Sequence, residues 1–141
     1  MTYMKPILLM AIAFTCFSFN AKSQDITNES LLRNGLSPLN SDNLKEIIVG
    51  NTLIHTSSSG QTIPMYYRAD GKRVFNMGAR RFEGPYTIKD NRRCESSSQG
   101  GEVCMTIYKT KPTQYVVCDP RDGGRCIWTM EVEAGNSRGI Q

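Results

Sequence analysis

The stretch YVVCDPRDGGRCIW, residues 115 to 128, places one cysteine on each side of a loop that is rich in Pro, Asp and Gly. β-branched and aromatic residues flank both cysteines, and the loop contains the residue types that tight turns require. Cys118 and Cys126 are therefore expected on two adjacent antiparallel strands. A disulfide between them would fasten this hairpin.

Similar β-rich runs recur at intervals of about ten residues from residue 51 onward, and turn residues separate them. The expected strands are residues 51–56, 62–68, 72–77, 84–89, 92–96, 102–109, 114–118 and 125–132. Long helices do not alternate with these runs, which disfavours a parallel sheet. The sequence therefore predicts a mainly β fold, an antiparallel up-and-down meander that closes into a small barrel of about eight strands, with one short N-terminal helix.

The N-terminal residues have the layout of a secretory signal peptide. Lys5 precedes an apolar run of 13 residues from Ile7 to Phe19, and small residues follow before Gln24. The run is shorter than the roughly 20 residues that a membrane-spanning helix needs. We therefore expect a signal peptide over 1–23, a polar lead-in over 24–40, and a single barrel-like domain over 41–141. The mature chain is expected to be periplasmic or secreted and to have no membrane span.

The charge of the mature chain is close to neutral. Lys5 and Lys22 belong to the leader, so 15 of the 17 basic side chains remain against 13 acidic ones, a net charge of +2. This excess is too small to predict nucleic-acid binding. The pairs Arg80–Arg81 and Arg92–Arg93 are expected at solvated strand ends.

The segment NSDNLKEIIVGN, residues 40 to 51, predicts the helix. Asn43 is placed to cap it with Glu46 three residues later, and Gly50 sits where a left-handed stop belongs. The shared apolar face consists of Leu44, Ile47 and Ile48. Upstream, at most a short helical turn is expected at Glu29 to Arg33.

Four cysteines remain after the leader, and an even number in an exported chain favours disulfides. The preferred pairing joins Cys94 to Cys104 and Cys118 to Cys126, because each bond closes one hairpin. The alternative joins Cys104 to Cys118 and leaves Cys94 and Cys126 to meet in a closed barrel. The cysteines are too far apart in sequence for zinc knuckles, so neither a metal nor a cofactor is predicted.

The register of the last hairpin leaves two possibilities open. Direct opposition of Cys118 and Cys126 would place Trp128 on the same face as Val116, whereas Val117 shares the other face with Tyr115. Either a bulge near Gly123–Gly124 shifts the last strand by one residue, or the sheet is covered on both sides.

The chain offers no strong catalytic pattern, and it is expected not to be an enzyme. His55 is the only histidine, and no Gly-x-Ser-x-Gly motif accompanies it. Glu131 and Glu133 alternate onto one face of the last strand, which also describes an ordinary solvent face. Two carboxylates of this kind would support an alternative function, a cell-wall glycan-acting enzyme.

The motifs GNTL (50–53), YYRADGK (66–72) and EGPYTIKDNRRC (83–94) resemble those of small exported alphaproteobacterial proteins of unknown function, the DUF995-like family. This resemblance implies a compact calycin-like β barrel, and it implies no established activity. Periplasmic C-type lysozyme inhibitors are similar in architecture only, as small disulfide-bearing barrels, so an inhibitor-like role is a further alternative.

These observations favour a small, disulfide-stabilised binding or interaction module with an unknown protein or small-molecule ligand. The ligand is expected either in the barrel mouth or on a basic surface. The candidate residues for the mouth are Tyr66, Tyr67, Tyr86 and Trp128, and those for the surface are Arg80, Arg81, Arg92 and Arg93.

Overall fold

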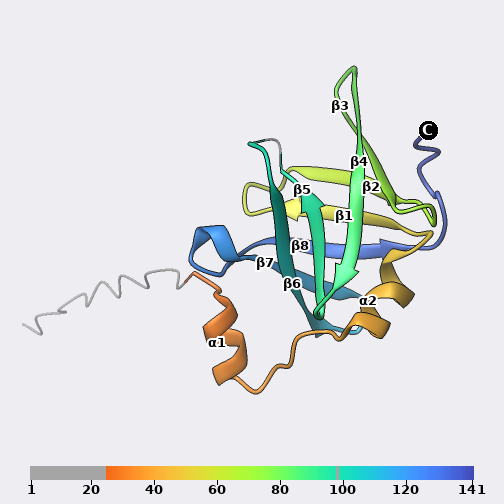
Figure 1. Cartoon of the computed structure of the whole chain (residues 1–141). Coiled ribbons are helices and arrows are strands. Elements are labelled where there is room, and N and C mark those ends of the chain that lie inside the picture. Colours follow the sequence, from red (N-terminus) through yellow and green to blue (C-terminus); the bar gives the residue numbers. More distant parts are fainter. Residues whose placement is uncertain (1–24, 98) are drawn as a thin grey trace, which may run out of the picture.

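The computed structural model describes residues 25–97 and 99–141, so the expected signal peptide lies outside the described residues. Eight antiparallel strands form a closed barrel in which each strand pairs with the next and β8 pairs with β1 (Figure 1). The strands are β1 (Thr52–Ser57), β2 (Thr62–Tyr67), β3 (Lys72–Met77), β4 (Arg80–Lys89), β5 (Arg92–Ser96), β6 (Glu102–Lys111), β7 (Gln114–Asp119) and β8 (Arg125–Glu133). The expected meander barrel is confirmed. In the described part of the chain, no helix is both long and apolar enough to cross a membrane.

Strand β4 is the one strand whose start differs from the expectation by more than two residues. The segment 78–84 was expected as a connection, but β4 begins at Arg80, which pairs with Met77 of β3. Gly78 has a φ of +60°, so β3 and β4 are joined by a tight turn of two residues. The rings of Phe75 and Phe82 stack across the pair with centroids 5.1 Å apart. This hairpin rises above the rest of the barrel (Figure 1).

Helix α2 (Ser41–Ile48) closes the opposite end of the barrel. Leu44 and Ile48 are fully buried in the core, together with the inward-facing Leu53 and Ile107. The expected cap was wrong, because the side chain of Asn40, three residues upstream, accepts the hydrogen bond from the Asn43 N–H.

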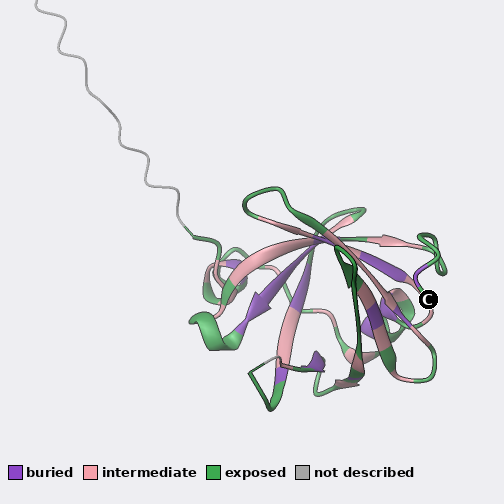
Figure 2. Cartoon of the chain, turned by 90° about the horizontal axis from the view of Figure 1, so that it is seen from above, coloured by how far each residue is buried: buried purple, intermediate pink, exposed green. Residues whose placement is uncertain are grey.

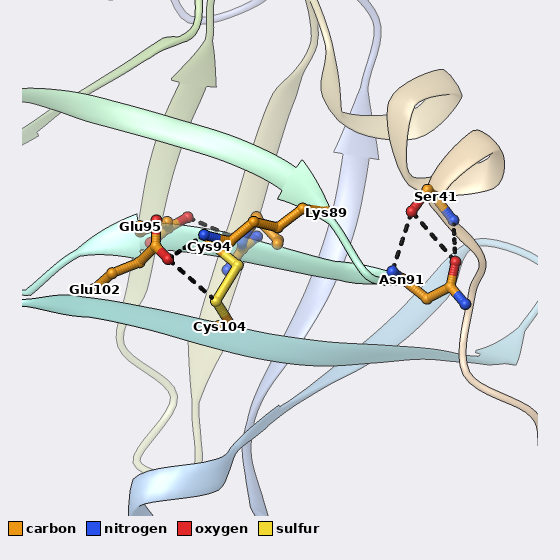
Figure 3. Close-up of a disulfide and its surroundings, with 8 residues drawn as sticks. Ser41, Lys89, Asn91, Cys94, Glu95, Glu102 and Cys104 are labelled. Carbon is orange, nitrogen blue, oxygen red and sulfur yellow. Dashed lines mark hydrogen bonds and ion pairs between the residues drawn. A yellow bond between two sulfur atoms is a disulfide. The ribbon is translucent and has the colours of Figure 1, made fainter.

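The turn between β4 and β5 anchors the start of α2. The Ser41 N–H donates to Asn91 Oδ1 at 2.8 Å, and the Asn91 N–H donates to Ser41 Oγ at 3.0 Å (Figure 3). Asp90 and Asn91 both have positive φ, as a two-residue hairpin turn that follows the strand twist requires. At the other end of the helix, Gly50 has the expected positive φ of +77°.

A second helix, α1 (Asn28–Arg33), was expected only as a short turn. Thr27 caps it, and the apolar Leu31 is buried against Tyr108 and Val116 on the outside of β6 and β7. This part of the sheet is therefore covered on both sides. Buried residues follow the strands, whereas loops and hairpin tips are exposed (Figure 2).

Disulfides join Cys94 to Cys104 (Figure 3) and Cys118 to Cys126, which confirms the preferred pairing. The expected one-residue shift is also present, but it lies within the paired strands and not at Gly123–Gly124: the β7–β8 register shifts between Val117 and Asp119. Because of this shift, Trp128 lies opposite Val117. The last hairpin therefore has a shifted register, and this part of the sheet is also covered on both sides.

Candidate functional site

A cavity of about 610 Å³ lies in the barrel at the end that α2 does not close. Its volume is in the range of small-molecule sites. Each of the eight strands contributes residues to its walls, and the β5–β6 and β7–β8 connections form its rim. The apolar wall residues include Phe75, Phe82, Val103, Met105, Ile127 and Trp128.

Charged side chains form the inner end of the cavity. Arg73 Nη1 lies 2.7 Å from one oxygen of Glu95, and Arg93 Nε lies 2.9 Å from the other. The buried Tyr67 hydroxyl donates a hydrogen bond to Glu95 at 2.7 Å. We call His55, Tyr67, Arg73, Arg93 and Glu95 the polar floor.

The local sequence of β5 explains why two of these charges point inward. Arg93 and Glu95 flank Cys94, and alternate residues of a strand share a face. Cys94 lies directly opposite Cys104 of β6, so the disulfide fixes this register and keeps both charged side chains inside the barrel. The stapled hairpin thereby positions part of the polar floor.

Arg93 is held in an environment that is unusual for a guanidinium group. The side chain is 2% exposed, and its charge lies 5.3 Å from the centroid of the Tyr67 ring. Its Nη1 lies 3.6 Å from the Met130 sulfur, and Nη2 lies 3.9 Å from the Met105 sulfur. Thioethers are weak acceptors, so these contacts replace little of the lost hydration.

The tautomer of His55 follows from its contact with Arg93. Arg93 Nη1 lies 3.1 Å from His55 Nε2, and a guanidinium group can only donate. His55 Nε2 therefore accepts, and the proton of the neutral ring resides on Nδ1. Burial and, next, the positive charge of Arg93 lower the pKa of His55 well below 6.5.

We expect His55 to make folding stability depend on pH. The unfolded chain gains a proton at this residue below about pH 6.5, whereas the folded protein excludes it. The free energy of unfolding should therefore fall by up to about 1.4 kcal/mol per pH unit as the pH drops below 6.5, until the lowered folded-state pKa is reached. Urea unfolding from about pH 7.5 to pH 5 should show a shallower slope for His55→Gln than for wild type. Parallel slopes would contradict this assignment.

The structure separates the aromatic residues that the sequence singled out. Trp128 lines the cavity, and Tyr67 lies buried in the polar floor. Tyr66 faces the opposite side of β2 from Tyr67, as expected from strand alternation. Tyr86 is packed in the core by α2, where its ring meets Tyr67 edge to face.

The arginine pairs do not form one basic surface. Arg80, Arg81 and Arg92 are exposed, and none of them lines the cavity. The expectation of a solvated strand end is wrong for Arg93. Strand alternation directs its side chain into the barrel, where Arg93 forms an ion pair with Glu95.

Arg73, Glu95 and His55 were not identified from the sequence as site residues. A signal was present, since Arg73 precedes Phe75 by two residues and therefore shares its face. Arg93 and Glu95 are also two residues apart in one strand and therefore share a face. Alternation shows which residues share a face, but it does not show which face becomes the interior.

The carboxylates considered for glycan chemistry lie away from the cavity. The inward-facing neighbours Met130 and Val132 place Glu131 and Glu133 on the outer face of β8. Hydrogen bonds from Arg138 and Ser137 lower the pKa of Glu133 to about 2. Glu133 is therefore ionised at neutral pH, which does not suit a general acid.

Comparisons with protein-family models, curated proteins and solved structures find no match to this chain. The likeness to DUF995-like proteins and to lysozyme inhibitors therefore stays a prediction from the sequence.

Proposed function

We propose that this protein is an exported binding module without catalytic activity, which takes a small molecule into the open end of its barrel. The observation that carries this proposal is the cavity of about 610 Å³, which combines apolar walls with a polar inner end. Sites for small ligands commonly have this composition, because apolar walls supply affinity and a few polar groups orient the ligand.

The construction of the barrel supports a preformed site. Every strand is paired on both sides, and the disulfide between Cys94 and Cys104 fastens two strands that line the cavity. A site that is rigid before binding loses little conformational entropy when the ligand enters. The two disulfides also support export, since such bonds persist in oxidising compartments.

A neutral apolar fluorophore, N-phenyl-1-naphthylamine, tests the proposal with the protein's single tryptophan as energy donor. Because Trp128 lines the cavity, bound probe should quench its emission in a saturable way with one probe per barrel. The variant Val103→Phe adds volume inside the cavity and should weaken binding at least about tenfold, by analogy with overpacked cores.

Val49→Phe is the matched control, because Val49 is 39% exposed at the end of α2 and does not line the cavity. Its probe affinity should equal that of wild type. Non-saturable quenching, or equal affinities of the Val49→Phe and Val103→Phe variants, would rule out binding in the barrel mouth.

A further inference from the structure

Three buried side-chain nitrogens in the described part of the chain have no hydrogen-bond partner, and all belong to the polar floor. They are His55 Nδ1, Arg73 Nε and Arg93 Nε; the Leu53 backbone is near His55 and raises its pKa against the effect of burial, but it makes no well-aligned hydrogen bond with Nδ1. Arg93 Nε lies close enough to Glu95 for an ion pair, but its N–H does not point at the oxygen, so no hydrogen bond forms. All three residues line the cavity, but the three nitrogen atoms themselves are covered by protein atoms.

The unpartnered nitrogens are all donors. A guanidinium nitrogen carries a proton and cannot accept, and His55 Nδ1 holds the proton that Nε2 lacks when it accepts from Arg93. Because these groups are donors and two of them belong to cations, the electrostatic potential at this end of the cavity favours a ligand with acceptors or negative charge. A carboxylate is an acceptor-only group with two oxygens, and it matches this demand better than a hydroxyl.

The charges of the polar floor favour the same ligand. Two arginines and one glutamate leave an excess of one positive charge, since His55 is neutral. The other two acids of the cavity lie at its rim, where Asp119 pairs with Arg121 at 2.7 Å and Asp122 pairs with Arg125 at 3.3 Å. A single negative charge on the ligand would therefore balance the buried end.

We propose that the ligand is an amphipathic monocarboxylate, whose carboxylate lies against the positively charged polar floor beside Arg73 and whose apolar chain lies along the aromatic wall. This assignment rests on the proposed function, because it names the ligand class of the same cavity. The wall above the polar floor offers Phe75, Phe82 and Trp128 to the chain. A small inorganic anion would leave this apolar surface in contact with water, which disfavours it.

Displacement of N-phenyl-1-naphthylamine by three probes tests the ligand class. Decanoate and decanol have the same chain, whereas acetate has the carboxylate without the chain. We expect decanoate to displace the fluorophore with an affinity roughly ten to a hundred times that of decanol, the effect of one hydrogen-bonded charge. Acetate should not displace it at the same concentrations.

Arg73→Met tests whether the polar floor recognises the carboxylate. This variant keeps the ion pair between Arg93 and Glu95 but removes the excess positive charge. The preference for decanoate over decanol should fall to within about threefold, because the lost contact is charge-assisted. Arg33→Met removes the same charge from the exposed surface of α1, and the preference should remain.

The outcomes separate the two proposals. Equal displacement by decanoate and decanol in the wild-type protein would overturn the carboxylate assignment and leave the binding function intact. Displacement by acetate would overturn the role of the apolar chain. A fluorophore that fails to bind at all would overturn the binding function itself. If Arg73→Met does not fold, as judged by its thermal unfolding, the ratio of the decanoate and decanol affinities of the wild-type protein alone decides whether the ligand is a carboxylate.

Discussion

Replacing Glu95 with glutamine should lower the free energy of unfolding by about 3 to 5 kcal/mol. The Glu95 carboxylate contacts both Arg73 and Arg93 inside the barrel, and its side chain is 7% exposed. Glutamine keeps the size of the side chain and can still accept from Tyr67, but it removes the one negative charge of the polar floor. Two buried guanidinium groups then share a region of low dielectric without a counter-ion, which is the source of the loss.

Urea unfolding followed by Trp128 emission measures this effect, and Glu29→Gln is the matched control. Glu29 also pairs with an arginine, but it and Arg33 are 72% and 76% exposed. Exposed pairs of this kind on a helix contribute about 0.3 to 0.5 kcal/mol. The two substitutions make the same chemical change, so the difference between them isolates the effect of burial.

A double variant distinguishes lost charge balance from lost packing. Adding Arg73→Met to Glu95→Gln removes one of the two uncompensated cations, so the double variant should be more stable than Glu95→Gln alone. A double variant that loses the sum of both single effects would show that packing, not charge, holds the polar floor together. A loss below about 1 kcal/mol for Glu95→Gln would contradict the buried ion pairs directly.

The strands were predictable because their boundaries are local. Each connection carries residues that favour turns, and Gly71 adopts the positive φ of +85° that the Asp-Gly dipeptide indicates. The disulfide pairs could be predicted from the positions of the cysteines on either side of each turn, since Cys94 faces Cys104 across one hairpin. The start of β4 was misplaced because the Gly78 to Gly84 segment contains a glycine at each end, and only the first of them makes the turn.

The polar floor was not predictable, because it depends on barrel closure. A pair of adjacent arginines normally indicates a solvated surface, and Arg92 is exposed as that pattern predicts. Arg93 is buried only because β5 pairs with β4 and β6 in a register that turns it inward. Arg73 and His55 reach the same place from β3 and β1, which are far from β5 in the sequence. No sequence pattern within one strand predicts that Arg73, His55 and Arg93 lie close together.

The second large effect is expected at the closed end of the barrel. Leu44→Ala in α2 should lower the free energy of unfolding by about 2 to 5 kcal/mol. Leu44 is fully buried and packs with Ile48 into the core that the strands enclose. Truncation removes apolar contacts and leaves a space that the stapled strands cannot easily collapse to fill.

Leu32→Ala makes the same change in α1, where the side chain is 49% exposed, and it should cost less than about 1 kcal/mol. Urea unfolding of both variants under non-reducing conditions gives the comparison. Equal losses of unfolding free energy for Leu44→Ala and Leu32→Ala would mean that α2 does not close the end of the barrel. The fluorophore adds a second criterion, because α2 and the cavity occupy opposite ends of the barrel. Folded Leu44→Ala protein should therefore bind N-phenyl-1-naphthylamine as tightly as wild type, and a tenfold weaker affinity would show that the plug and the binding site are not independent.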